Sequence, residues 1–161
     1  MSDVPLSTKF EVLTEITRAS HFAWHAAVRK VCPSIDPMKV TLEMWRLTGK
    51  QTGAAYLRKI DRHLPLAPQV AASICWSSAC MGEDAVVEDG GDRAAFVVHR
   101  GCPWQRWHEK NGLVQEDRPG CDEWFRATIE TVNEALGTKV RFETLESLPE
   151  GGKSCRRRIW E

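Results

Sequence analysis

Three cysteines in the second half of the chain are the residues whose type and position best suit chemistry. Cys102 lies in a Gly-Cys-Pro turn after an expected strand, Cys121 lies at the expected start of a helix, and Cys155 lies in the last expected strand. Thiolates are good nucleophiles and soft metal ligands. Three thiols at element boundaries predict either one shared site or three small core residues. Their wide spacing, without a Cys-x-x-Cys pair, leaves both interpretations open.

Two histidines flank the first of these cysteines. His99 precedes Cys102 and His108 follows it. An imidazole beside a thiol forms a pair that can attack an electrophilic carbon, so we expect Cys102 as nucleophile or metal ligand and His99 or His108 as general base. A helix N-terminus at Cys121 would lower the pKa of that thiol. The alternative is that the cysteines only fill the core and that His108 is exposed.

A second constellation is the pair His21 and His25, four residues apart on an expected helix. Such a pair can bind one metal ion. Together with Cys102, Cys121 and Cys155 it forms the set of candidate ligands for a zinc or iron ion. The ordinary alternative is a pair of histidines with no ligand. The glycine pairs match no phosphate-binding loop, so no nucleotide site is expected.

The chain is rich in tryptophan, with seven in 161 residues. Each indole offers a large apolar surface and one donor, which suits a core or a pocket. We expect Trp24, Trp45 and Trp104 to line a site for a small-molecule ligand or substrate.

The formal net charge is zero, with 22 basic and 22 acidic residues. Nucleic-acid binding is therefore not expected, because the basic excess that it needs is missing. The run 156–158 of three arginines is interpreted as a solvated face or a local anion contact. No apolar run is long enough to cross a bilayer and no leader pattern is seen, so we expect a cytoplasmic protein with reduced cysteines and no membrane partner.

Periodicity predicts helices over 7–31, 36–63, 67–80, 104–110 and 121–136, with β-hairpins over 83–100 and 138–160. Asp36 and Pro37 are a helix N-cap and first turn. Gly49 and Gly53, on one helix face, allow another backbone or a ligand to come close. The order predicts a single α+β domain over 1–161: N-terminal helices pack on an antiparallel sheet of two β-hairpins, with a further amphipathic helix between them.

The motifs resemble those of the L-2-amino-thiazoline-4-carboxylate hydrolase-like proteins. The likeness rests on Cys102-Pro103 after a strand, on Cys121 before a helix, on Cys155 in the closing strand, and on the segments 21–25 and 42–57. It covers about Phe10 to Trp160. More distantly, the element order is similar to the vinyl-reductase-type ligand-binding domains and to the TRAPP-like vesicle-tethering fold.

The resemblance implies an α+β fold with an apolar pocket and cysteines at its edge. It also implies hydrolysis of a C–N bond in a small cyclic or amidine-like substrate. The vinyl-reductase-type relatives bind small hydrophobic molecules and can hold structural zinc. Three hypotheses follow: a small hydrolase, a non-catalytic metal- or ligand-binding accessory or sensor protein, and an assembly subunit. The third predicts an exposed apolar patch and self-association as a homodimer.

Overall fold

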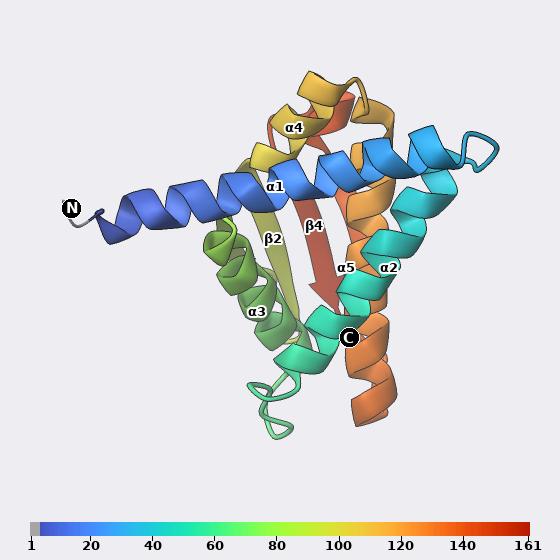
Figure 1. The fold of residues 1–161 in the computed structure, drawn as a ribbon. Helices are drawn as coiled ribbons and strands as arrows, with labels where there is room; N and C mark the ends of the chain where they lie inside the picture. Colours follow the sequence, from blue (N-terminus) through green and yellow to red (C-terminus); the bar gives the residue numbers. More distant parts are fainter. Residues whose placement is uncertain (1–3) are drawn as a thin grey trace.

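The computed structural model describes residues 4–161. Helices come first, and strands alternate with helices in the second half (Figure 1). The elements are α1 (Leu6–Val31), α2 (Pro37–Tyr56), α3 (Leu66–Cys80), β1 (Asp84–Asp89), β2 (Ala94–Gly101), α4 (Pro103–Asn111), α5 (Val114–Leu136), β3 (Arg141–Glu146), a 3-10 turn (Leu148–Glu150) and β4 (Cys155–Trp160). The predicted α+β class and the two antiparallel hairpins are confirmed.

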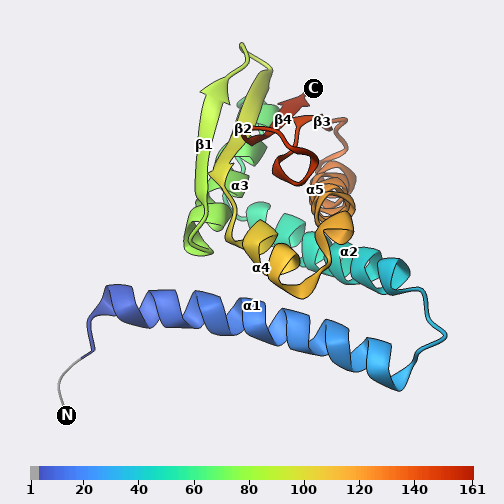
Figure 2. The same cartoon turned by 90° about the horizontal axis from the view of Figure 1, so that it is seen from above.

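The four strands form one sheet in the order β1-β2-β4-β3, with every neighbouring pair antiparallel. Both hairpins therefore join through their second strands, β2 and β4. Helices α3 and α5 supply most of the buried side chains that pack on the sheet. Seen from above, α1 is the outermost layer, with α2 and α4 between it and the sheet (Figure 2).

Strand β4 alternates in the way that a sheet with one covered face requires. Cys155, Arg157 and Ile159 are buried, while Arg156 and Arg158 are more exposed. His99 pairs with Cys155 and Val97 pairs with Arg157, so these four residues share the face that the helices cover. The alternation places one arginine of the basic run inside the protein, next to a cysteine.

Helices α2 and α5 pack with their backbones almost in contact, and two glycines make this possible. A Cβ at Gly49 would lie 2.6 Å from the carbonyl oxygen of Trp124, and a Cβ at Gly53 would lie 2.5 Å from that of Thr128. The hydroxyl of Thr128 donates to the carbonyl of Gly49 at 3.1 Å. The predicted close approach at these glycines is therefore an approach of another helix.

Helix α5 begins seven residues earlier than expected. The residue before a proline is usually pushed out of the helical region, so Pro119 favoured a helix that starts after it. Instead the helix begins at Val114 and continues through Pro119. Tertiary packing explains the difference. Gly120 lies directly against Trp45 of α2, as shown by the distance of 2.5 Å between a Cβ built on Gly120 and the indole ring.

The other boundaries differ less. Asp36 caps α2 as predicted, accepting from the backbone N–H of Met38 at 3.0 Å. The helix then ends at Tyr56 rather than near His63, and turns lead to α3, whose start at Leu66 is two residues before Pro68. Within the part of the chain that the structure describes, no helix is long and apolar enough to cross a membrane.

The α2–α5 contact generates a stability prediction. Gly49→Ala should lower the free energy of unfolding by about 1–3 kcal/mol, because the added methyl group overpacks a backbone contact. This loss should occur although alanine improves helix propensity by about 1 kcal/mol. Urea denaturation followed by circular dichroism measures it, with Gln51→Ala at an exposed position of the same helix as control. A Gly49→Ala protein as stable as the wild type would contradict this packing.

Candidate functional site

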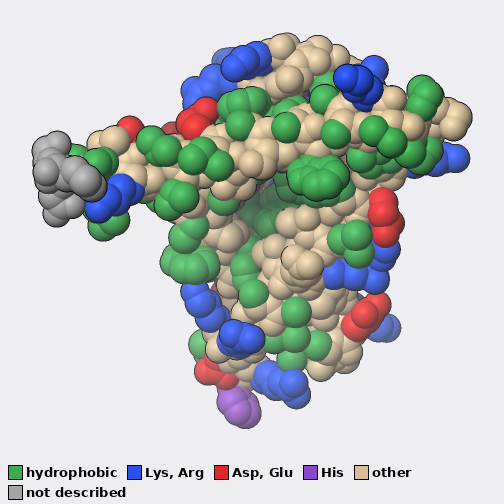
Figure 3. All heavy atoms as spheres, in the orientation of Figure 1, with side chains coloured by type: hydrophobic (Ala, Val, Ile, Leu, Met, Phe, Trp, Pro, Cys, Tyr) green, Lys and Arg blue, Asp and Glu red, His purple; other side chains and the backbone are tan. Residues whose placement is uncertain are grey.

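A cavity of about 400 Å³ lies between the sheet and the helices, and its walls are largely apolar. It opens beneath α1, where a hollow with hydrophobic side chains is visible between α3 and α2 (Figure 3). Every helix contributes to it, together with β2 and β4 and the residues next to β1 and α4. The lining residues are Thr17, His21, Met44, Trp45, Thr48, Thr52, Ser77, Ser78, Met81, Glu83, His99, Cys102, Trp104, His108, Asp117, Cys121, Trp124, Phe125, Cys155 and Arg157.

The three cysteines singled out by the sequence do meet here. Cys102, Cys121 and Cys155 all line this cavity, although they come from the start of α4, from α5 and from β4. Cys102 and Cys155 are near enough to Cys121 to influence its ionisation. The expected convergence on one site is therefore present in the structure.

Cys102 and Cys121 are not in the ionised state that nucleophilic chemistry needs. Burial, with a smaller effect of the Glu83 carboxylate, raises the pKa of Cys102 to about 12. Burial also raises the pKa of Cys121 well above its usual value. Because α5 begins at Val114, Cys121 lies within the helix and not at its N-terminus, so the expected lowering of its pKa by the helix dipole was wrong. Both thiols are protonated at neutral pH.

The histidines beside Cys102 are engaged with carboxylates. His99 lies on β2 with its Nε2 atom 2.9 Å from Ser78 Oγ and 3.2 Å from Glu83 Oε2. His108 is buried rather than exposed, and its Nδ1 atom lies 3.0 Å from the carbonyl oxygen of Trp104 and 3.1 Å from Asp117 Oδ2. These contacts fix both rings in the cavity wall.

Aromatic rings close the cavity on the side of α1. His21, Trp45 and Trp104 pack against one another, with ring centroids 5.4–5.5 Å apart. Burial, helped by His108 and His25, lowers the pKa of His21 to about 4, so its ring is neutral at pH 7. Trp45 and Trp104 thus line the cavity as expected, and Trp124 joins them. The structure places Trp24 outside, with 73 % of its surface exposed.

The two histidines of α1 do not join the cysteines in a metal site. His25 turns to Glu116, with 2.9 Å between Nε2 and Oε2, and Glu116 also accepts from Thr41 at 2.7 Å. Among residues 4–161, no three or more His, Cys, Asp and Glu side chains are grouped so that they could hold a metal ion. The prediction of a metal-binding protein is therefore corrected: in the described residues Cys102, Cys121, Cys155, His21 and His25 form no group of this kind.

Arg157 is the main site residue that the sequence analysis missed. Its side chain is almost fully buried, at 1 % exposed, and lines the cavity. Nε and Nη2 donate to Asp122 Oδ1 at 3.2 and 3.1 Å, and the guanidinium carbon lies 4.6 Å from the ring centre of Phe125. A signal was present: in a strand with period 2, residue 157 shares its face with Cys155 and Ile159.

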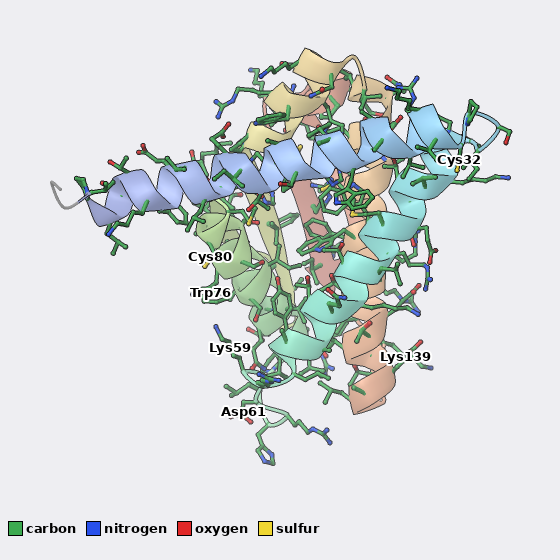
Figure 4. All side chains as sticks on the ribbon, in the orientation of Figure 1. Cys32, Lys59, Asp61, Trp76, Cys80 and Lys139 are labelled. Atoms are coloured by element: carbon green, nitrogen blue, oxygen red, sulfur yellow. The ribbon has the colours of Figure 1, made fainter. Side chains whose placement is uncertain are left out.

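The remaining cysteines lie elsewhere. Cys75 is buried in the core, while Cys32 and Cys80 lie at the ends of α1 and α3, far from each other and outside the cavity (Figure 4).

Trp76, close to Cys80 on the same helix, is covered by the ammonium group of Lys59, 3.3 Å from its ring centre.

Comparisons with known proteins reveal a relative in fold only. No family model matches the chain, and no curated protein matches it. Among solved structures, the chain is similar to a trafficking protein particle complex subunit 3 from Naegleria fowleri, covalently bound to palmitic acid. The TM-score is 0.57 at 12 % identity, and the match covers 93 % of this chain and 95 % of that one.

This similarity supports the TRAPP-like fold that the element order suggested and gives no support to the thiazoline hydrolase-like family. The prediction of a hydrolase loses its support together with that family, because the fold match is to a different kind of protein and the pKa values of Cys102 and Cys121 are raised. Cys102, His99 and His108 line the cavity, and we assign them no catalytic role.

The raised pKa of Cys102 predicts an unreactive thiol. A pKa of about 12 rather than 9.0 lowers the thiolate fraction at pH 8 about a thousandfold, and burial slows access further. Alkylation by iodoacetamide, followed by peptide mass spectrometry, should modify the exposed Cys80 at least a hundredfold faster than Cys102. Equal rates at the two cysteines in folded protein would refute the neutral buried thiol.

The lowered pKa of His21 predicts a pH effect on stability. The folded protein favours the neutral ring, so the unfolded chain takes up a proton first and stability falls as the pH drops from 6.5 toward about 4. Unfolding free energies at several pH values should show a smaller fall in His21→Gln than in the wild type. The control is His63→Gln, at an exposed position. Parallel curves for the wild type and His21→Gln would show that His21 does not contribute.

Proposed function

We propose that this chain is a non-catalytic subunit of a protein assembly and that it binds a second copy of itself through α1. One observation carries the proposal: a row of uncharged, exposed residues along one side of this 26-residue helix. We name it the α1 stripe. It consists of Leu6, Leu13, Thr17, Ser20, Trp24, Ala27 and Val31.

The α1 stripe has the spacing of a helix-pairing seam. Its positions follow one another at intervals of three, four or seven residues, as in the a and d positions of a heptad repeat. Leu6, Trp24 and Val31 are 81 %, 73 % and 77 % exposed. Large apolar side chains so exposed, in one row, are typical of a surface that another protein covers.

A different face of α1 holds the helix to the rest of the protein, which leaves the stripe free. Thr14, Arg18 and Phe22 are the buried residues of α1. Arg18 donates to the carbonyl oxygen of Met81 beyond α3, and the ring of Phe22 stacks on Trp107 of α4 with 5.6 Å between centroids. Trp107 in turn donates from Nε1 to Glu15 at 3.2 Å.

A second copy suits this surface because a row of uncharged residues along a helix is complementary to the same row on another copy. In a two-fold symmetric dimer the same patch lies on both sides of the interface. An antiparallel pair of α1 helices centred between Thr17 and Ser20 would place Leu6 against Val31 and Leu13 against Trp24. The pairing sets the small residues at the centre and the large ones toward the ends.

Two further observations support a subunit rather than an enzyme. The fold neighbour is named as a subunit of a trafficking complex. In addition, the thiols of Cys102 and Cys121 are neutral, and the histidines near Cys102 contact carboxylates. We include a cytoplasmic location in the proposal, as the six free cysteines suit a reducing compartment.

Sedimentation velocity at rising protein concentration tests the proposal. The wild type should self-associate, and Trp24→Glu or Leu13→Glu should weaken association at least tenfold, because a carboxylate would be buried in an apolar contact. The matched control is Leu145→Glu, an exposed leucine on β3 at 51 % exposure. A wild type that stays monomeric at high concentration would refute self-association, and equal effects of Leu13→Glu and Leu145→Glu would refute the role of α1.

A further inference from the structure

We infer that the cavity is a binding site for an uncharged, largely apolar molecule that carries a hydrogen-bond-accepting oxygen, such as a carbonyl, and that Arg157 binds this oxygen. The inference goes beyond the proposed function, since it concerns the cavity under α1, which shares only Thr17 with the α1 stripe. It rests on three properties of the cavity: an unpaired buried donor, the balance of charge and the shape of the walls.

The unpaired donor is Nη1 of Arg157. Arg157 lines the cavity with its side chain 1 % exposed, and its Nε and Nη2 atoms both donate to Asp122. Nη1 is buried and has no hydrogen-bond partner. A buried donor without an acceptor is costly, and buried polar groups in native proteins are nearly always paired. A ligand oxygen in the cavity would supply the acceptor.

The charge of Arg157 is already balanced, which argues against an anionic ligand. Asp122, which also accepts from Thr144 at 2.7 Å, is its partner. The cavity wall carries two further carboxylates, Glu83 and Asp117, each within 3.2 Å of a histidine nitrogen. Arg157 is the one lysine or arginine among the lining residues that the structure describes. A carboxylate or phosphate would therefore enter a site with acidic groups and no free cation, whereas a neutral acceptor meets no such repulsion.

The walls define the rest of the ligand. Trp45, Trp104, Trp124 and Phe125 offer aromatic surfaces on the helix side, and about 400 Å³ holds a molecule of the size of a bicyclic aromatic. The sheet side is polar, where Arg157 is joined by His99, whose Nδ1 atom is also buried and unpaired. The ligand would thus lie with its oxygen toward the sheet and its apolar body toward the helices.

Isothermal titration calorimetry with three naphthalenes tests the inference on the wild-type protein. 2-Acetylnaphthalene carries a neutral carbonyl, 2-naphthoate a carboxylate, and 2-ethylnaphthalene no acceptor on the same ring system. The ketone should bind about tenfold more tightly than either of the others, as expected for a hydrogen bond to a charged donor. Equal or tighter binding of the carboxylate would overturn the neutral-ligand claim. Equal binding of ketone and hydrocarbon would overturn the role of an acceptor.

A variant pair assigns the effect to Arg157. Arg157→Met should remove the preference for the ketone over the hydrocarbon, while Arg156→Met, at the neighbouring and more exposed position paired with Glu88, should keep it. If Arg157→Met does not fold, the comparison of the three compounds on the wild-type protein still tests whether the cavity prefers a neutral acceptor. Absence of binding of all three at millimolar concentration would overturn the inference, whatever the oligomeric state of the protein.

Discussion

The close contact between α2 and α5 is the constraint on which the rest of the structure depends. With backbone against backbone at Gly49 and Gly53, the two helices form one rigid wall. The same spacing at Gly120 lets the indole of Trp45 lie across α5 and reach the cavity. This contact also explains why α5 continues as a helix past Pro119. Asp117 and Cys121 therefore face the site from one continuous helix. A larger residue at any of these glycines would push α2 and α5 apart.

The site behind this wall combines polar groups with low reactivity. Burial keeps the thiols of Cys102 and Cys121 protonated and the His21 ring neutral. Carboxylates lie beside His99 and His108, and Asp122 neutralises Arg157. Burying so many polar groups is costly unless they pair, and His99, His108 and Arg157 each have at least one polar partner, although Nη1 of Arg157 and Nδ1 of His99 have none. The pairing gives a cavity with a defined shape and a polar end, which suits recognition more than bond breaking.

Much of the fold could be predicted from the sequence, because its signals are local. Asp36-Pro37 marks a helix start, and the glycine turns mark the hairpins. The start of α5 could not be predicted in this way, since Pro119 argues locally for a break and only the contact with Trp45 explains its place in a helix. Local preferences give way where packing is strong enough.

The sequence predicted which cysteines meet at the candidate site but not their chemical state, because that state depends on tertiary structure. Residue type pointed to Cys102, Cys121 and Cys155, and these do converge. Their chemistry depends on burial, which residue type does not reveal, so reactive thiols were expected where burial raises the pKa values of Cys102 and Cys121. Arg157 was hidden inside a run of three arginines, although strand alternation distinguishes it from its neighbours.

Helix α1 forms part of the cavity wall and part of the outer surface, and both parts move together with the helix. Thr17 and His21 form part of the cavity lining, while Trp24 and Val31 project to the surface from the same helix. A partner that shifts α1 would therefore change the walls of the cavity, and an occupant of the cavity would change the position of α1. Thermodynamic linkage makes such an effect reciprocal: whatever factor the partner applies to ligand affinity, the ligand applies to partner affinity. The helix would then couple the state of assembly to the occupancy of the cavity.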